Sequence, residues 1–202
     1  RHAYLALKFG AKSVVAIDNA PKTVASAKRT LQGFPNAAVE ETSIYDIPYE
    51  NHFDLCYSIG VIHHLEDPKK ALDRLIRALR PGGKLLVWLY GYEGNEVYVR
   101  LFQIFHPVLK WIPPKMIHVF AYLFSVPLYM VLKMYPFKSG YFRHIKDYPF
   151  CYIHLTVHDQ LLPAISRYYK RNEVEALFQS CRLSDYQIIP YKGYSWKVIG
   201  TK

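Results

Sequence analysis

The residues best suited to chemistry in this 202-residue sequence are an acid that follows a short apolar run and two pairs of histidines. Asp18 comes directly after the β-branched, uncharged run Val14–Ile17, which itself follows Gly10. A run of this kind predicts a buried strand, and a lone carboxylate at the carboxyl end of such a strand is a common means of holding a ribose. Asp18 is therefore the first candidate binding residue.

The histidines point to acid–base or metal chemistry. His63 and His64 are adjacent, so on a helix-like turn their side chains point in different directions and do not chelate one ion together. His154 and His158 have the i, i+4 spacing that could hold a metal on a helix, but β-branched residues between them disfavour a helix. We therefore expect no metal site, and we keep His63 and His158 as candidate catalytic residues.

The elements that would position these residues alternate regularly over residues 1–91. Pro21 and Pro68 suit a first helical turn, Asp67 can cap a helix, and Gly10 and Pro81–Gly83 can end one. Strands that alternate with helices at this spacing predict a parallel sheet wound on both faces. The pattern predicts helices over 1–9, 21–31 and 68–79, and strands over 14–17, 38–41, 53–59 and 85–90.

Four segments of this region occur in a fixed order: VVAIDNAP, YDIP, FDLCYSIGVIHHLEDP and LRPGGKLLVWLY. In that order they resemble the class I S-adenosylmethionine-dependent methyltransferases, particularly the branch that acts on small molecules. The resemblance covers residues 1–91 and implies a Rossmann-like α/β fold, a mostly parallel sheet and S-adenosyl-L-methionine as the cofactor. Residues 166–202 agree, because a helix, a strand, a tight turn at Lys192 and Gly193 and a second strand form the antiparallel hairpin that completes such sheets.

The resemblance also implies how the nucleoside part of the cofactor is held. Asp18 would accept hydrogen bonds from both ribose hydroxyls, since a carboxylate offers two acceptor oxygens and no donor. Asn19 beside it would touch the ribose or the adenine. Asp46 would accept from the adenine amino group while Ile47 packs against the ring. Ordinary turn roles stay open for all three polar residues.

Ser58 and Gly60 end the next buried strand, where backbone carbonyls in such enzymes face the methionine part of the cofactor. Gly60 permits close approach or merely a bend. Because the sulfonium is already an activated leaving group, the protein chiefly holds the acceptor in line with the methyl group and excludes water. A hydroxyl or amine acceptor also needs a group that takes its proton, hence the interest in His63 and His158.

Asp18 lies close to the start of the sequence, which opens on Arg1. In Rossmann-type sheets such an acid follows the glycine-rich loop by about twenty residues. Residues 1–16 contain no such loop. We therefore expect the first strand and its glycine loop to be missing from this sequence, and a sheet without that strand to be poorly stable and to bind the cofactor weakly.

Residues 92–165 do not continue the alternation and are rich in Phe, Tyr, Leu and Pro, which predicts a helical cap inserted between 1–91 and 166–202. Its most apolar part, Met116–Leu132, has no formal charge. Three descriptions fit it: a lid of packed helices, a helix at a lipid interface, or a membrane span. The first two are compatible and favour a bulky or lipid-linked acceptor. The flanking residues are Lys110, Trp111, Lys115, Lys133 and Lys138.

Composition limits the partners. The chain is 51% apolar and 21% charged, as globular proteins are, and its three cysteines share no metal-ligand spacing and fit a reducing cytoplasm. The net charge of +10 invites a nucleic-acid partner, but residues 96–170 hold their nine Lys or Arg among aromatic and aliphatic runs rather than in one basic stripe. We therefore expect no nucleic-acid partner, and a cytoplasmic protein for which peripheral attachment to the inner face of the membrane stays open.

Three classes of function remain. The first is an S-adenosylmethionine-dependent methyltransferase that acts on a small-molecule or lipid-linked acceptor. The second is a non-catalytic, methyltransferase-like module that binds a membrane or a partner. The third is a nicotinamide-dependent oxidoreductase, since an acid after the second strand could equally hold that ribose, although the YDIP and HHLEDP segments speak against it.

Overall fold

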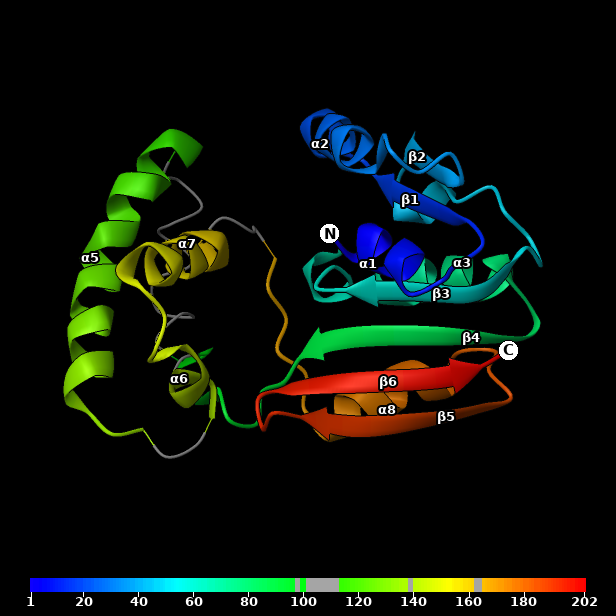
Figure 1. Ribbon diagram of the computed structural model, residues 1–202. Helices are drawn as coiled ribbons and strands as arrows, with labels where there is room; N and C mark the ends of the chain where they lie inside the picture. The colour runs from blue at the N-terminus through cyan, green and yellow to red at the C-terminus, as the bar shows by residue number, and fades with distance from the viewer. Residues whose placement is uncertain (97–98, 101–112, 138–139, 162–164) are drawn as a thin grey trace.

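The computed structural model describes residues 1–96, 99–100, 113–137, 140–161 and 165–202. An alternating β/α part carries the strands, and a group of helices stands beside it (Figure 1). In chain order the elements are α1 (His2–Lys8), β1 (Val14–Asp18), α2 (Pro21–Leu31), β2 (Ala37–Glu41), the 3₁₀ helix η1 (Ile44–Asp46), β3 (Phe53–Ile59), the 3₁₀ helix η2 (Ile62–His64), α3 (Pro68–Ala78), β4 (Leu79–Tyr90), α5 (Pro114–Met134), α6 (Gly140–Ile145), α7 (Phe150–Leu161), α8 (Arg171–Gln179), β5 (Asp185–Tyr191) and β6 (Ser195–Thr201).

The strands form two hydrogen-bonded sheets. β1 and β2 pair in parallel, from Val14 opposite Ala37 to Asp18 opposite Glu41. The second sheet has the order β3-β4-β6-β5, in which β3 and β4 are parallel and β6 is antiparallel to both of its neighbours. The fold is therefore α/β, with parallel strands completed by a C-terminal antiparallel hairpin, as the sequence predicts.

Within the described residues, no ladder of hydrogen bonds joins β1 to β3. Both strands nevertheless point toward the same side of the molecule (Figure 1). The expectation that a first strand and its glycine loop are missing stays a prediction.

Local signals account for most of the element boundaries. The Asp67 carboxylate accepts a hydrogen bond from the Lys70 N–H (2.9 Å) and so caps α3. Gly10 ends α1 with φ +94°, a conformation that costs glycine little. Lys192 and Gly193, which lie in the loop between the paired residues Tyr191 and Ser195, both have positive φ and so turn the chain sharply.

The start of β4 differs most from the predicted boundaries. The helix ends at Ala78, and β4 begins at Leu79, so the Pro81–Gly83 run lies inside the strand rather than between two elements. The reason is a distant partner. The Gly82 N–H donates to the Lys202 carbonyl (3.0 Å), and the Lys202 N–H donates to the Gly83 carbonyl (3.0 Å), which extends the sheet past the turn.

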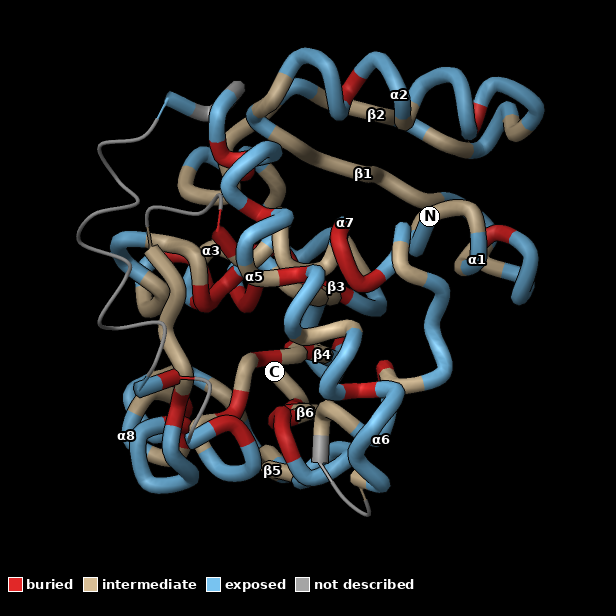
Figure 2. Tube along the Cα trace, turned by 90° about the vertical axis from the view of Figure 1, so that its left-hand side faces the viewer, coloured by how far each residue is buried: buried red, intermediate tan, exposed pale blue. Residues whose placement is uncertain are grey.

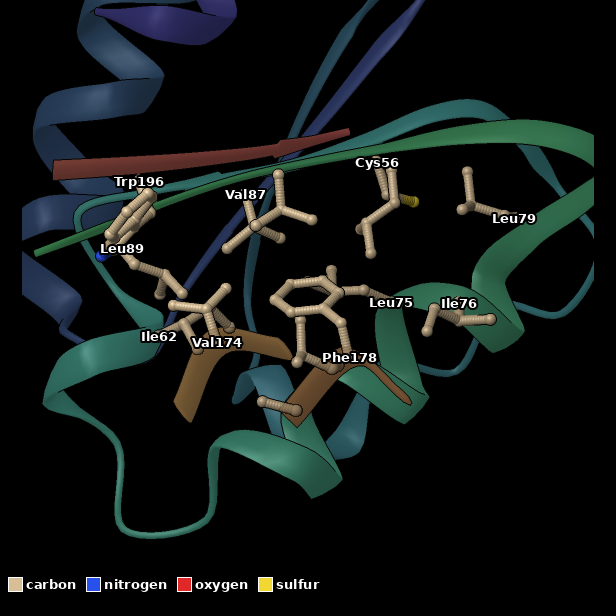
Figure 3. Close-up of a cluster of buried hydrophobic side chains, with 14 of the residues drawn as sticks. Cys56, Ile62, Leu75, Ile76, Leu79, Val87, Leu89, Val174, Phe178 and Trp196 are labelled. Atoms are coloured by element: carbon tan, nitrogen blue, oxygen red, sulfur yellow. The ribbon is translucent and has the colours of Figure 1, made fainter. Parts of the chain in front are cut away.

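The main core lies between the larger sheet and the helices α3 and α8, which cover one of its faces (Figures 1 and 2). The ring of Phe178 from α8 lies at the centre of this cluster, among Leu75 of α3 and Val87 and Leu89 of β4 (Figure 3). Phe178 is 0% exposed. Burial of a ring of this size contributes several kcal/mol, so this cluster fixes α3 and α8 on the sheet.

The helices α5, α6 and α7 fall within the predicted cap and face the ends of β1, β3 and β4 (Figure 1). α5 packs against α7 through two small clusters of buried side chains. The prediction that the segment around Thr156 and Val157 is not helical is wrong. α7 is a helix because Ile153 and Leu161, which are buried at helical spacing, are packed against α5, and this packing outweighs the weak preference of β-branched residues.

α5 contains the apolar segment that the sequence singles out. Its segment Met116–Met134 has a mean hydropathy of 1.5. By length and composition this segment could cross a membrane, and 22% of it is buried inside the protein. Lys110, Trp111 and Lys138, which flank it in the sequence, lie outside the described residues.

We expect Phe178→Ala to destabilise the protein by about 3–5 kcal/mol, because it removes a fully buried ring and leaves a cavity. Phe9→Ala is the matched control. Phe9 is 87% exposed, so its truncation should change the free energy of unfolding by no more than about 0.5 kcal/mol. Urea unfolding of both variants measures the difference, and equal losses would contradict the assignment of Phe178 to the core.

Candidate functional site

The parallel strands β1, β3 and β4 end at one edge of the fold, and this edge faces the cap helices (Figure 1). Their last residues are Asp18, Ile59 and Tyr90. In α/β folds, ligands bind outside the carboxyl ends of the parallel strands. The edge therefore holds the predicted binding residues, and the cap is placed to cover whatever binds there.

Asp18 is partly buried at the end of β1. Its Oδ1 accepts a hydrogen bond from the Ala20 N–H (2.8 Å), and its backbone carbonyl accepts one from the Thr42 N–H (3.0 Å). The first bond is the turn contact that the sequence left open. An ionised carboxylate has further acceptor positions, so the turn role and a role toward a ligand are compatible. Asn19, the next residue, is exposed.

Thr42 also joins Asp18 to the segment that carries the second predicted acid. This segment runs into η1, where the Ser43 Oγ accepts from the Tyr45 N–H (3.2 Å). Asp46 at the end of η1 is exposed, whereas Ile47 is 6% exposed and belongs to the main core. The structure thus brings both acids to the same edge. It packs Ile47 against the core, so the predicted contact of Ile47 with an adenine ring stays a prediction.

Ser58 and Gly60 lie at the end of β3. Ser58 is buried, and its hydroxyl has no hydrogen-bond partner in the described part of the chain. Gly60 has φ +79°, which favours glycine, and there is open space where a Cβ would lie. A buried hydroxyl without a partner is a group that a polar ligand can satisfy. Two acids, this hydroxyl and the open space beside Gly60 fit a cofactor that carries a nucleoside and a polar chain.

His63 lies in the interior and not in an open site. It is 0% exposed, it stacks on Tyr90 with ring centroids 3.7 Å apart, and neither ring nitrogen has a hydrogen-bond partner among the described residues. Burial, followed by the nearby His64, lowers the pKa of His63 to about 3. His63 is therefore neutral at physiological pH, and its position gives no support to a role as a base. His64 donates from Nδ1 to the Ile165 carbonyl (2.7 Å), a structural contact.

His158 lies on α7 and faces α5. Its Nδ1 is 3.5 Å from Asp159 Oδ1, and its ring centroid is 5.5 Å from that of His118. His154 on the same helix is buried and has its Nδ1 3.0 Å from the Ser125 Oγ. Burial, followed by the two neighbouring histidines, lowers the pKa of His154. No group of three or more side chains able to hold a metal ion is found in the described residues.

A cavity of about 430 Å³ lies between the cap and the end of β4. Neither His63 nor His158 lines it. Its wall is mostly aromatic and aliphatic, and every residue in it comes from β4 or a later part of the chain. The lining residues are Trp88, Tyr90, Asn95, Phe124, Leu128, Tyr141, Phe142, His144, Ile145, Tyr148, Thr156, Val157, Gln160, Leu161, Tyr168 and Tyr194.

A small polar group lies in this apolar wall. The Gln160 Nε2 donates to the Tyr90 hydroxyl (2.9 Å), and the Tyr168 hydroxyl donates to the Gln160 Oε1 (2.8 Å). Burial raises the pKa of Tyr90. Because its oxygen accepts from Gln160, the neutral Tyr90 hydroxyl directs its own proton elsewhere. The cavity can therefore orient one polar group of a molecule whose body is apolar.

Sequence reasoning missed this cavity, although β4 carries a signal for it. Side chains alternate along a strand, and the odd-numbered residues Leu85, Val87 and Leu89 are buried in the core. Trp88 and Tyr90 therefore lie on the opposite face. Two large aromatic residues on the face away from the core indicate a second packed or ligand-binding surface.

The buried state of His63 predicts a pH dependence. In the unfolded chain His63 binds a proton near its ordinary pKa of 6.5, and in the folded protein it does so only near about 3. Acid therefore favours the unfolded chain, so the free energy of unfolding is highest above about pH 6.5 and falls as the pH drops below it. We expect a loss of about 2 kcal/mol at about pH 5 from this residue. Urea unfolding of wild type and His63→Phe at neutral and acidic pH measures it. His63→Phe should lose less stability on acidification by that amount, and an equal loss would show that another group is responsible.

Comparison with known sequences finds relatives for the first part of the chain. Residues 1–87 match a family model described as a methyltransferase domain. The chain is 38% identical over 97 residues to a tRNA U34 carboxymethyltransferase of Methylococcus capsulatus, which is 46% of this chain and 30% of that protein. It is 40% identical over 47 residues to phosphoethanolamine N-methyltransferase 2 of Caenorhabditis elegans, which is 23% of this chain and 11% of that protein. The chain thus matches less than a third of the length of either relative.

Solved structures extend the likeness to the whole chain. YcgJ of Bacillus subtilis has a TM-score of 0.59 at 14% identity, over 100% of this chain and 87% of that chain. A SAM-dependent methyltransferase of Aquifex aeolicus has a TM-score of 0.54 at 17% identity, over 98% of this chain and 73% of that chain. At these identities the likeness shows the fold. Residues 1–87, the segment that holds Asp18, Asp46 and Gly60, thus match a methyltransferase domain, and the chain has the Rossmann-like fold of these solved structures.

Proposed function

We propose that this protein transfers a methyl group from S-adenosylmethionine to an acceptor with an apolar body, either a small molecule or a lipid-linked one. The observation that carries the proposal is the cavity of about 430 Å³ at the carboxyl end of β4, whose wall is mostly apolar and includes the hydrogen-bonded group of Tyr90, Gln160 and Tyr168. This volume lies in the range that is usual for pockets that bind small molecules.

In this proposal the residues at the edge have separate roles in the reaction. The cofactor, when bound, supplies a methyl group on an activated sulfonium. Asp18 and Asp46 offer acceptors to its nucleoside, and Gly60 leaves room for its polar chain. The cap helices exclude water from the cavity, and the Tyr90 hydroxyl orients the polar end of the acceptor. Rate enhancement then comes mainly from the position of the acceptor, because the chemistry asks little of side chains.

The location of the cavity favours an acceptor specific to this protein. The family match ends at residue 87, and every residue that lines the cavity lies beyond it. Relatives that share the cofactor-binding part can therefore act on different acceptors, because proteins of one fold can have different substrates.

A tRNA acceptor is the second candidate. It departs from the sequence-based expectation that excludes nucleic acid, and two observations favour it. Several relatives are named tRNA U34 carboxymethyltransferases, and the net charge of +10 suits a polyanion. Against it, the wall of the cavity is hydrophobic, whereas a nucleotide needs several polar partners.

We expect Asp18→Ala in the full-length protein to weaken S-adenosylmethionine binding by about 10- to 100-fold, the scale of a lost hydrogen bond to a charged group. Isothermal titration with the cofactor measures the change. Asp185→Ala is the control, because Asp185 is an exposed acid at the start of β5, at the opposite end of the sheet. Equal affinity for both variants would remove Asp18 from the binding site.

A second prediction concerns the acceptor. Thr156→Trp, which fills the cavity from α7, should abolish methyl transfer but leave cofactor affinity unchanged. Thr30→Trp, an exposed position near the end of another helix, should leave both unchanged. The measurement is transfer of a labelled methyl group to a lipid extract, to polar small molecules and to bulk tRNA.

The proposal is supported if wild type and Thr30→Trp label the lipid or small-molecule fraction and Thr156→Trp does not. Label in tRNA that persists in Thr156→Trp would overturn it in favour of the second candidate.

A further inference from the structure

α5 is apolar on two opposite sides, and within the described part of the chain only one of them packs against other helices. Its inner side packs against the other cap helices through Ile117, Ala121 and Leu132, none more than 5% exposed. Its outer side carries large apolar side chains that recur every three or four residues and so form one stripe along the helix. The stripe consists of Met116, Val119, Phe120, Leu123, Val126, Met130 and Met134.

This stripe is long and exposed. Leu123 is 67% exposed, Val119 68% and Met134 85%. A helix of 21 residues is about 30 Å long, so the stripe runs over much of one side of the cap. α5 is the outermost element of the cap, with α7 between it and the sheet (Figure 1), and exposed and buried positions recur along its length (Figure 2). A continuous apolar surface of this size marks an interaction site.

The charged residues near the stripe indicate which kind of partner it binds. Residues 114–146 contain no acid, and the basic residues lie toward the ends of α5 and just after it. Lys133 near the carboxyl end of α5 donates from Nζ to the Lys146 carbonyl (2.9 Å) and lies over the Tyr129 ring, 5.2 Å from its centroid. Tyr135, which follows α5, is 61% exposed. An apolar stripe with a lysine and tyrosines at its carboxyl end matches the acyl region and the anionic headgroups of a bilayer surface.

The inner side of α5 argues against a span. The Ser125 hydroxyl on that side is 0% exposed and lies 3.0 Å from the buried His154 Nδ1 of α7. A helix that crossed the bilayer alone would have to leave this partner and the two packed clusters.

We propose that the outer stripe of α5 inserts into the interfacial region of an anionic lipid bilayer, with the helix axis parallel to the membrane. The stripe then lies among the upper acyl chains, and Lys133 lies among the headgroups. The cap remains folded on the sheet, so the cavity stays on the protein side of α5. This inference does not rest on the proposed function, because membrane binding needs neither cofactor nor acceptor.

The test is flotation of the full-length protein with vesicles of phosphatidylcholine, with and without phosphatidylglycerol. We expect stronger binding to the vesicles that contain phosphatidylglycerol, and weaker binding as salt is raised. Leu123→Glu should lower the partition coefficient by about tenfold or more, because it replaces an inserted apolar side chain by a carboxylate. Phe9→Glu, which places the same charge on an exposed aromatic residue far from the cap in sequence, should bind as wild type does.

A second variant reports where the helix lies. Leu123→Trp should keep vesicle binding, and its added fluorescence should shift to the blue with phosphatidylglycerol vesicles, since the indole enters an apolar region. Absence of vesicle binding, or equal binding of Leu123→Glu and Phe9→Glu, would overturn the proposal. So would a dimer in solution that Leu123→Glu dissociates while no vesicles are bound, because a second copy would then cover the stripe. Methyl transfer is not part of either readout, so a failure here leaves the proposed function untouched.

Discussion

Both halves of the molecule depend on the alternation of side chains along β4. Leu85, Val87 and Leu89 point to one face and pack with α3 and α8, which holds the sheet and its helices together. Trp88 and Tyr90 point to the other face and form part of the cavity wall. One strand thus fixes the positions of the core and of the cavity relative to each other, and a register shift by one residue would exchange the residues that face them.

The parts of the fold that could be predicted from the sequence depend on contacts between near neighbours. β-branched runs, prolines at first helical turns and the Asp67 cap act within a few residues, and β3 and α2 have the predicted bounds. The start of β4 was missed because its partner, Lys202, lies at the other end of the chain. α7 was missed for the same kind of reason, since packing against α5 decides its conformation.

The candidate site was predictable in part for a related reason. Asp18 and Asp46 follow local strand and turn signals, and the structure places both at the same edge. The cavity gathers residues from β4, three cap helices and Tyr194 near the end of the chain, so no local pattern reveals it. The two histidines that drew attention by type do not line the cavity. His63 is buried against Tyr90, a residue of the cavity wall, and His158 lies on α7 beside His118 of α5. Residue type alone could not show which of them is near an open site.

The two sheets have a consequence for the cooperativity of folding. β1 and β2 are hydrogen-bonded to each other, and in the described residues no ladder connects them to β3. Such a pair can open locally at a lower free energy than the larger sheet. A ligand that contacts Asp18 on β1 and Ser58 on β3 bridges the two units, and by mass action it stabilises the state in which both are in place. Occupancy of the edge would then decide whether the strands that form it unfold as one unit or as two.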